Sequence, residues 1–381
     1  MKKVVIASDK YKSCLTSMEV ATAIKEGILS VFPHCEVIKI PVADGGDGTL
    51  QTLVEGTRGI YKTVKVMNPL MQPIEAQYGV LGDGKTVVIE LAAASGLALV
   101  PESSRNPMLT TTYGTGQLIL DALQAGYTDF IIGIGGSATN DAGTGLLQAL
   151  GCRFLDETGN ELAQGGQILK NIAKIDFSGC TPLLNNARFR IASDVQNPFF
   201  GRQGAAYVYA PQKGATPDMV RELDNGLQHF ALLIQRTKGL DINRIPGAGA
   251  AGGVGGAMVA FLNASIEPGV DLILDYLDFD KQIVNADWII TGEGKMDAQT
   301  AQGKVPKGVA DRAQKQQIPV VAFAGSIEDY EIINKMGIAS AFSITPSPLS
   351  LEEAMNPETA RQNLYQTVKQ VFSLVSQFPF E

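Results

Sequence analysis

Short apolar runs that end in glycine or an acidic residue alternate along this chain with amphipathic segments. The runs are "VVIASD" (4–9), "FIIGIGG" (130–136), "WIITGEG" (288–294), "VVAFAG" (320–325) and "AFSIT" (341–345). Helical periodicity marks many of the segments between them: "SMEVATAIKEGILSVF" (17–32), "GTGLLQAL" (143–150), "VADRAQKQQ" (309–317) and "ETARQNLYQTVKQVFSLVSQF" (358–378). This alternation predicts a parallel sheet covered by helices. Such sheets bind ligands at the carboxyl ends of their strands, where the glycines and acids of this chain lie.

Two other stretches break this pattern and predict a second domain. Residues 60–105 alternate and turn often, as in an antiparallel meander, and residues 150–265 are mixed, with extended segments expected at "RFRIASDV" (188–195) and "GAAYVYA" (204–210). We therefore expect an α/β protein of two α/β domains with the active cleft between them. A Rossmann-like layered parallel sheet would take 1–65 plus 275–381, and about 105–150 could join it. A mixed α/β domain would be inserted at 66–274.

Composition excludes several classes of protein. The chain is 45% hydrophobic and 18% charged, as in soluble globular proteins, and it has no apolar run long enough to span a membrane. The apolar run in "MKKVVIASDK" is too short for a signal peptide, so we expect a cytoplasmic protein with reduced thiols at Cys14, Cys35, Cys152 and Cys180.

The charged residues and the histidines narrow the chemistry further. The net charge is −8 and there is no basic run, which argues against a nucleic-acid partner. The only histidines, His34 and His229, lie in no metal-ligand or nucleophile motif, which argues against zinc hydrolysis and Ser-His-Asp catalysis. Carboxylates, lysines, backbone amides and Mg²⁺ remain as the expected chemical groups.

One apparent nucleotide motif is rejected by its context. Residues 79–86, "GVLGDGKT", match the P-loop pattern G-x-x-x-x-G-K-T, which requires a helix after the lysine. Here "VVIE" follows, and three β-branched residues favour a strand. With a strand also expected upstream, Asp83-Gly84 would form the turn of a β-hairpin.

Two glycine-rich loops are better ligand candidates. "GIGGSATNDAGTG" (133–145) follows a strand and opens a helix, so its backbone amides and the small side chains of Ser137, Thr139 and Asn140 could bind a phosphate or carboxylate. "GAGAAGGVGGAM" (247–258) has the spacing of a dinucleotide fingerprint but follows Arg-Ile-Pro instead of a strand. A tight turn that only packs is the alternative for the first loop, whereas the second remains a candidate for ligand contact as a flexible loop that leads into a helix.

Acidic and basic residues follow several of the predicted strands. Asp44 and Asp47 flank a Gly-Gly turn in "PVADGGDGT" (41–49), and Asp194 ends a strand in "ASDVQNPFFG" (192–201). "TGEGKMDAQTAQGKVP" (291–306) and "SDKYKS" (8–13) add further charges. Helix capping and surface ion pairs are the structural alternatives.

Taken together, these segments resemble the bacterial type-1 glycerate kinase family. The resemblance rests on "IASDKYKSCLTS", "PVADGGDGT", "GIGGSATNDAGTG", "ASDVQNPFFG", "GAAYVYAPQKGA", "GAGAAGGVGGAM" and "TGEGKMDAQTAQGKVP", in the family's order from residue 4 to about 325. The family opening D-S-F-K-G-S-L keeps Asp9, Lys12 and Leu15, with Tyr11 in place of the phenylalanine, whereas Lys10, Ser13 and Cys14 depart from it. The family lacks a P-loop, in agreement with the hairpin at 79–86.

The resemblance implies transfer of a phosphoryl group from ATP to D-glycerate with Mg²⁺, favouring 2-phosphoglycerate and leaving 3-phosphoglycerate open. We expect Asp194 to orient or deprotonate the substrate hydroxyl, with Lys12 and Lys295 as further catalytic groups. Substrate binding is assigned to Asp9, Asp44, Arg202 and Lys213, and metal binding to Asp47, Glu293 and Asp297. The nucleotide or its phosphates would contact Gly135, Gly136, Ser137, Thr139, Asn140, Gly249, Gly252 and Lys304. No nucleic-acid or membrane partner is expected, and a homo-oligomer stays open.

The sequence leaves two alternative functions open. An NAD-dependent hydroxy-acid dehydrogenase fits the composition, but the failed context of the dinucleotide fingerprint argues against it. A non-catalytic nucleotide or sugar-acid sensor would keep the ligand site without the chemistry.

Overall fold

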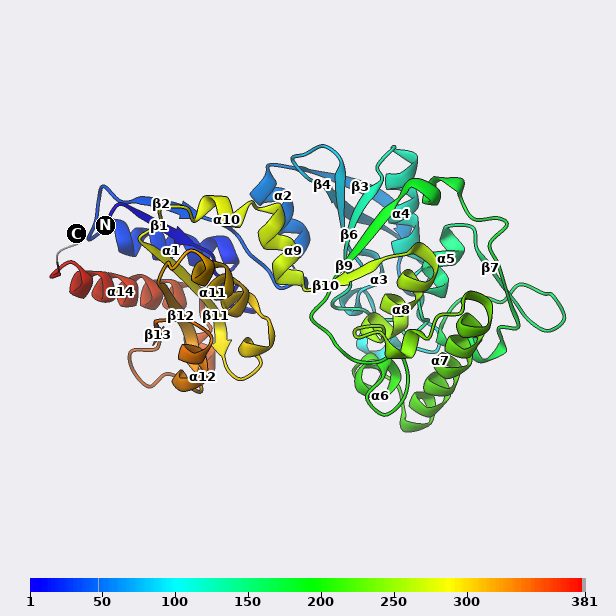
Figure 1. Cartoon of the computed structure of the whole chain (residues 1–381). Helices are drawn as coiled ribbons and strands as arrows, with labels where there is room; N and C mark the ends of the chain where they lie inside the picture. Colours follow the sequence, from blue (N-terminus) through cyan, green and yellow to red (C-terminus); the bar gives the residue numbers. More distant parts are fainter. Residues whose placement is uncertain (47, 379–381) are drawn as a thin grey trace. The chain divides into compact units, whose positions relative to one another are not determined.

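The computed structural model describes residues 1–46 and 48–378, without the side chain of Gln302 (Figure 1). The chain divides into two compact units: a terminal unit of Met1–Asp44 and Val270–Glu381, and an inserted unit of Gly45–Gly269. The expected boundaries at 65/66 and 274/275 differ from these. Residues 45–65 belong to the inserted unit because α2 (Thr49–Thr57) and β3 (Ile60–Met67) pack against its strands, and 105–150 lie there too.

The terminal unit contains a five-stranded sheet in the order β13-β12-β11-β1-β2, with every neighbouring pair parallel. Its strands are β1 (Lys3–Ile6), β2 (Glu36–Lys39), β11 (Trp288–Met296), β12 (Val320–Ile327) and β13 (Ser340–Ser343). Val4, Val5 and Ile6 are completely buried, as the apolar run predicts for a central strand covered on both faces.

Three helices of the terminal unit lie in predicted amphipathic segments: α1 (Ser17–Leu29), α11 (Val305–Lys315) and α14 (Pro357–Val375). Further helices are α9 (Gly269–Tyr276, whose first residue closes the inserted unit), α10 (Phe279–Gln282), α12 (Tyr330–Lys335) and α13 (Leu351–Ala354), with a 3₁₀ turn η7 at Thr300–Gln302. α1 begins with a capping box between Thr16 and Glu19. It packs against α14, and the two helices share one apolar core with β1 and β12.

The inserted unit contains a six-stranded mixed sheet in the order β10-β9-β6-β5-β4-β3. Its strands are β3, β4 (Pro73–Val80), β5 (Thr86–Glu90), β6 (Asp129–Gly133), β9 (Arg188–Ala192) and β10 (Ser265–Glu267). β5, β6, β9 and β10 run parallel, whereas β4 pairs antiparallel with both β3 and β5. The β4–β5 hairpin confirms that residues 79–86 are not a P-loop.

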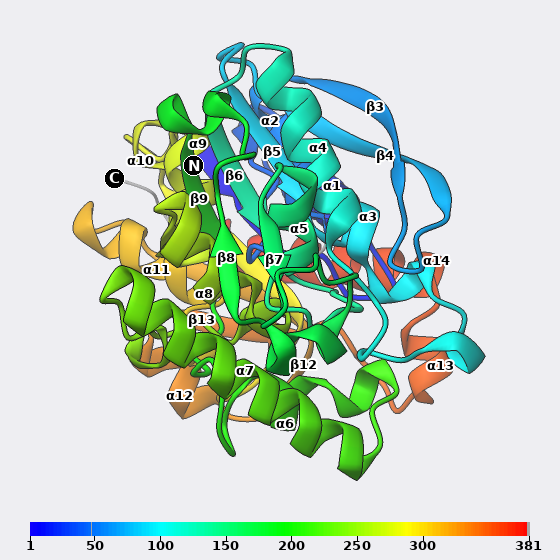
Figure 2. The ribbon, with the colours of Figure 1, turned by 90° about the vertical axis from the view of Figure 1, so that its right-hand side faces the viewer.

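Seven helices cover the described part of the inserted unit: α2, α3 (Ala92–Ser95), α4 (Tyr113–Gln124), α5 (Thr144–Ala149), α6 (Ala205–Tyr209), α7 (Pro217–Lys238) and α8 (Ala250–Leu262). Short 3₁₀ helices are η1 (Leu97–Leu99), η2 (Glu102–Ser104), η3 (Gly166–Asn171), η4 (Pro182–Asn186), η5 (Pro211–Lys213) and η6 (Ile242–Arg244). α4 and α5 lie side by side (Figure 2). In residues 1–46 and 48–378, no helix combines the length and the apolar character needed to cross a membrane.

The helix α6 corrects the expectation of an extended segment at 204–210. The valine and tyrosines there favour a strand, but Ala205 and Ala206 are completely buried, and α6 packs against α7 and α8. Alanine has high helix propensity and allows close packing, so tertiary contacts outweigh the β-branched and aromatic neighbours.

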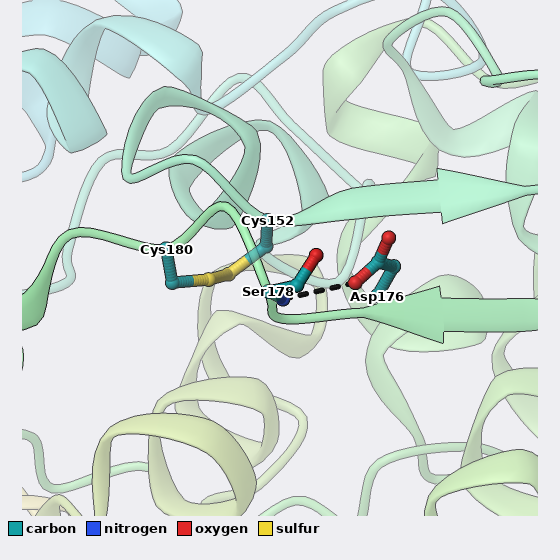
Figure 3. Close-up of a disulfide and its surroundings, with 4 residues drawn as sticks. All are labelled: Cys152, Asp176, Ser178 and Cys180. Carbon is teal, nitrogen blue, oxygen red and sulfur yellow. Dashed lines mark hydrogen bonds between the residues drawn. A yellow bond between two sulfur atoms is a disulfide. The ribbon is translucent and has the colours of Figure 1, made fainter.

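A disulfide joins Cys152 to Cys180 beside the small antiparallel pair β7 (Arg153–Leu155) and β8 (Lys174–Asp176) (Figure 3). The backbones of Gly151 and Gly179 lie so close here that a Cβ atom on Gly151 would be 2.2 Å from the carbonyl oxygen of Gly179. The bond corrects the expectation of four reduced thiols, whereas Cys14 and Cys35 are free.

Candidate functional site

Three carboxylates of the terminal unit lie close enough to affect one another's ionisation. Asp9 follows β1, Asp44 is the last residue before the inserted unit, and Glu293 lies within β11. Burial raises the pKa of Asp9 to about 7, and the negative charges of Asp44 and Glu293 add to this effect. The Lys10 N–H, which donates to Asp9 Oδ1 at 2.7 Å, acts in the opposite direction. The structure therefore brings Asp9, Asp44 and Glu293 together as an acidic cluster.

Glu293 is only 6% exposed, and burial raises its pKa as well. The Thr300 hydroxyl donates to Glu293 Oε1, and the Lys304 ammonium lies 3.8 Å from Oε2; both contacts favour the charged form. Lys304 therefore lies beside the acidic cluster, where its positive charge could neutralise the negative charge of phosphate oxygens.

β11 is longer than expected and continues through the acidic segment to Met296. Its pairing with β12 explains this, because Lys295 and Met296 extend the parallel ladder opposite Ser326 and Ile327. Lys295 is half exposed, with its ammonium 2.6 Å from Glu328 and 3.8 Å from Asp297. Its hydrogen bond to Glu328 raises the pKa of Lys295. Lys295 and Asp297 are therefore linked by a surface ion-pair network, and their roles in catalysis and metal binding stay predictions.

The terminal unit also contains Lys12, which is exposed, and whose amide nitrogen would lie 3.5 Å from a Cβ atom on Gly294 of β11. Asp47, expected as a metal ligand, lies outside the described residues. Among the residues that the structure describes, no three histidine, cysteine or acidic side chains form a ready-made metal site. Mg²⁺ often takes only one or two carboxylates plus phosphate oxygens and waters, so the acidic cluster still offers suitable ligands.

In the inserted unit, the glycine-rich loop 133–145 connects β6 to α5, as predicted. Gly136 is exposed and has φ +66°, whereas Ser137, Thr139 and Asn140 are buried. The Lys213 ammonium donates to Ser137 Oγ at 2.7 Å and to the Thr139 carbonyl oxygen at 2.6 Å. The structure therefore joins Lys213, expected to bind substrate, to residues expected to bind phosphate.

Asp141 is a central residue of this loop that we did not single out from the sequence. It is completely buried and accepts hydrogen bonds from the Thr112 N–H and hydroxyl (2.8 Å each), and from the N–H groups of Gly143 (3.1 Å) and Gly145 (3.3 Å). Burial raises the pKa of Asp141, whereas the hydrogen bonds from these donors lower it in part. Asp141 thus connects the start of α4 to the start of α5 and holds the loop between them. An aspartate within a Gly-Ser-Thr-Asn loop was the available signal.

Close backbone contacts account for glycine at 249 and 252. A Cβ atom on Gly249 would lie 2.1 Å from the Pro198 carbonyl oxygen, and one on Gly252 would lie 2.2 Å from the Thr139 carbonyl oxygen. Ala251, Gly252 and Gly253 all have positive φ within α8, so the backbone turns sharply against the 137–141 segment. The preceding element is η6 and not a strand, which confirms that the dinucleotide fingerprint lacks its context. A nucleotide-binding role for both glycines stays a prediction.

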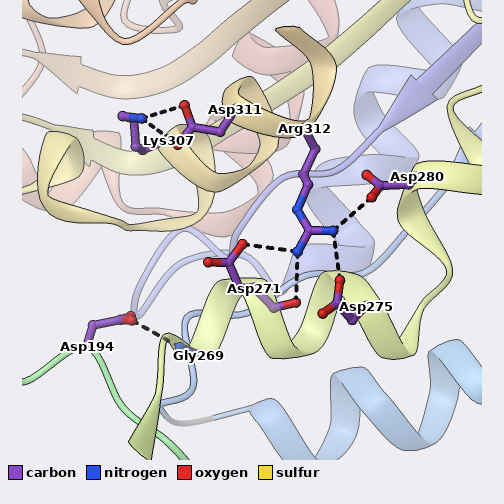
Figure 4. Close-up of polar contacts among 8 residues, drawn as sticks. All are labelled: Asp194, Gly269, Asp271, Asp275, Asp280, Lys307, Asp311 and Arg312. Atoms are coloured by element: carbon purple, nitrogen blue, oxygen red, sulfur yellow. Dashed lines mark hydrogen bonds and ion pairs between the residues drawn. The ribbon is translucent and has the colours of Figure 1, made fainter. Parts of the chain in front are cut away.

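Asp194 follows β9, as expected, and its Oδ1 accepts a hydrogen bond from the N–H of Gly269 at 3.0 Å (Figure 4). Gly269 is the first residue of α9, so Asp194 also caps that helix. Arg202 is exposed and stacks over the Tyr207 ring at 5.1 Å from its centroid. Of the two cations expected to hold the substrate carboxylate, Lys213 is the buried one.

Elsewhere in the terminal unit, Arg312 of α11 contacts Asp271 (3.1 Å), Asp275 (2.7 Å) and Asp280 (2.9 Å), which fixes α11 to α9 and α10 (Figure 4). This network has a structural role.

Burial of Lys213 is expected to make the free energy of unfolding depend on pH. Burial lowers the pKa of Lys213 from 10.5 to about 7, although Asp141 attracts the charged form. Between these values the unfolded chain holds a proton that the folded protein has lost, so rising pH favours the folded state. The unfolding free energy of the wild type relative to Lys213→Met should therefore increase from pH 7 towards pH 10. Urea unfolding across this range measures the difference, and a difference that does not change with pH would contradict the expectation.

Comparison with known proteins places these features in a family. The glycerate kinase family model matches residues 4–376, through both units. The chain belongs to the glycerate kinase family. Membership makes it a kinase, which leaves the dehydrogenase and the sensor without support.

Relatives match over almost the full length. A protein from Halalkalibacterium halodurans named glycerate kinase is 49% identical over 93% of this chain and 94% of its own. An Escherichia coli protein named glycerate 2-kinase is 46% identical over 92% and 93%, respectively. The crystal structure of a protein assigned as glycerate kinase 2 from Salmonella typhimurium LT2 is 44% identical, with a TM-score of 0.89 over 99% of this chain and 98% of that one.

Proposed function

We propose that this protein transfers the terminal phosphoryl group of ATP to the 2-hydroxyl of D-glycerate, forming 2-phosphoglycerate and ADP. The observation that carries the proposal is the full-length match, at 46% identity, to a protein named glycerate 2-kinase. The family model matches residues 4–376, a range that includes every residue assigned a role here. With ATP as the proposed donor, we also propose that the protein acts in the cytoplasm.

The acidic cluster supports a role for Mg²⁺. Asp9, Asp44 and Glu293 gather negative charge in a buried environment. Burial raises the pKa of Asp9 and Glu293, and the negative charge of Asp44 adds to this effect. A cation would relieve the repulsion, and carboxylate oxygens are the protein ligands that Mg²⁺ prefers. Asp44 and Glu293 are the carboxylates that we propose to hold it. When bound, Mg²⁺ would neutralise charge on the phosphate oxygens.

Other groups of the chain supply positioning and proton transfer. Both substrates are anions, so catalysis depends on neutralising their charges and on orienting the acceptor hydroxyl. Lys304, beside Glu293, is a candidate cation for the transferring phosphoryl group. Asp194, which the Gly269 N–H holds in a fixed orientation, is the proposed base that accepts the proton from the glycerate hydroxyl.

An ADP-release assay with D-glycerate, followed by ³¹P NMR of the product, tests the proposed function. We expect ADP to form only when D-glycerate and Mg²⁺ are both present, with a product phosphorus coupled to the single proton at carbon 2. Coupling to two protons would indicate phosphorylation at the 3-hydroxyl instead. If D-glycerate bound without ADP release, the protein would be a sensor, and nicotinamide reduction would indicate a dehydrogenase.

A further inference from the structure

Lys213 is a buried cation whose ammonium group lacks a nearby carboxylate. Lys213 is only 2% exposed, and its ammonium group donates two hydrogen bonds to uncharged oxygens, Ser137 Oγ and the Thr139 carbonyl oxygen. Within residues 1–46 and 48–378, no acidic oxygen lies within 4.0 Å of the ammonium, and Asp141 acts on it only at longer range. A buried ammonium is costly without a paired anion, so this arrangement suits an anion that comes from outside the chain.

The loop segment held by Lys213 also has polar atoms without partners. Thr139 Oγ1 and both side-chain amide atoms of Asn140, Oδ1 and Nδ2, are buried and form no hydrogen bond. Unpaired buried polar atoms are rare in proteins, because each costs free energy in the folded state. Three of them in two consecutive residues, next to the carbonyl that Lys213 contacts, are an independent sign of a ligand.

We propose that Lys213, Ser137, Thr139 and Asn140 form the binding site for the carboxylate end of the acceptor acid. This inference rests on the proposed function, in which the acceptor is D-glycerate. The ammonium group has a third N–H available for a carboxylate oxygen, and hydroxyls and an amide can both donate to and accept from a hydroxy acid. One lysine among neutral groups suits a singly charged carboxylate better than a triphosphate.

The proposal separates the two cations that the sequence left as alternatives. Arg202 is exposed and stacks on Tyr207, whereas Lys213 is buried and contacts the glycine-rich loop directly. Desolvation strengthens an ion pair, so the buried lysine can bind a small acid with one contact. The conformation of the loop then determines which acids fit.

Binding of the acid is expected to be accompanied by proton uptake. Burial lowers the pKa of Lys213 to about 7, so part of the free protein is neutral at this position near neutral pH. A bound carboxylate favours the ammonium form, and the missing proton is then taken from solvent. Asp141 is the carboxylate whose charge acts on Lys213, and it accepts hydrogen bonds from Thr112, Gly143 and Gly145.

Two variants of the full-length protein test the proposal through the KM for D-glycerate. Thr139→Val removes a hydroxyl that has no partner in the free protein, so it should leave the melting temperature unchanged or raise it. Lys213→Met removes the charge. Each variant should raise the KM for D-glycerate. For Lys213→Met we expect a rise of about 10- to 100-fold, which corresponds to the loss of one charge-assisted hydrogen bond. The KM for ATP should stay within about twofold of the wild-type value in both variants. Lys174→Met, an exposed lysine on β8 of the same unit, is the matched control and should change neither value.

Calorimetric titration with D-glycerate near pH 7.5, in two buffers of different ionisation enthalpy, gives the protons taken up per ligand. We expect uptake by the wild type and none by Lys213→Met. An unchanged KM for D-glycerate in both variants would overturn the proposal, and internal water would then be the partner of the unpaired atoms. A rise in the KM for ATP alone would also overturn it and would indicate a phosphate site instead. A wild type that does not phosphorylate D-glycerate would refute the proposed function itself, which distinguishes the two failures.

Discussion

Replacement of Asp194 by asparagine is expected to lower kcat by a factor of about 10³ while the protein stays folded. A general base contributes about 10² to 10⁴ to the rate, and an amide cannot accept the proton. Asparagine keeps an oxygen that can accept the hydrogen bond from the Gly269 N–H, and it is as good a helix cap as aspartate. Steady-state kinetics with D-glycerate and a thermal melt measure the two effects separately.

Asp83→Asn is the matched control for this variant. Asp83 lies in the β4–β5 turn of the same unit and also accepts backbone N–H groups, from Lys85 and Thr86 at 2.9 Å each. It belongs to the rejected P-loop pattern, so its replacement should leave kcat unchanged. A near-normal kcat in Asp194→Asn, or equal losses in both variants, would remove Asp194 from the proposed chemistry and leave it as a helix cap.

Replacement of Asp141 by alanine is expected to destabilise the inserted unit strongly. The variant would leave the buried donors of Thr112, Gly143 and Gly145 without an acceptor and the buried Lys213 without its nearest negative charge. Each buried donor left without an acceptor costs about 1–3 kcal/mol, so we expect the variant to lose about 3 kcal/mol or more. Urea unfolding should show this loss, together with a loss of kinase activity because the loop is no longer held.

Asp156→Ala separates burial from hydrogen bonding as the cause. Asp156 also accepts several hydrogen bonds, from the Thr158 N–H (2.9 Å) and hydroxyl (2.7 Å) and from the Asn160 N–H (2.9 Å), but these contacts are exposed. Water can replace a lost exposed partner, so this variant should lose about 1 kcal/mol or less. If the two alanine variants lost equal stability, burial of Asp141 would not be the reason.

Much of the fold could be predicted because local signals and tertiary contacts agree. The apolar runs at 4–9, 130–136 and 320–325 became buried parallel strands, and "VVIE" after Lys85 correctly indicated a strand. Where contacts outweigh local preference, prediction failed. The valine and tyrosines of 204–210 gave no hint of α6, and nothing local indicated that β11 would continue past Gly294 along β12.

The candidate site was predictable in its residue types but not in its groupings. Asp9, Asp44 and Glu293 were each noticed, although their mutual repulsion depends on distances that only the fold supplies. Lys213 and Ser137 were assigned to different ligands from their residue types, and a contact between residues 76 positions apart could not be foreseen from the sequence. Asp141 was missed because a short acid between glycines resembles an ordinary turn residue, and complete burial cannot be read from the sequence.

The insertion of one unit within the other also affects the order in which this protein can form. Ser8 and the Gly292 carbonyl oxygen with which it bonds are 284 positions apart, so β1 lacks its neighbour β11 until the ribosome has made most of the chain. The inserted unit, by contrast, is complete once residue 269 has been synthesised. Domains generally fold as units during synthesis. The middle of the polypeptide can thus reach its native state first, while the earliest residues wait for the last third of translation.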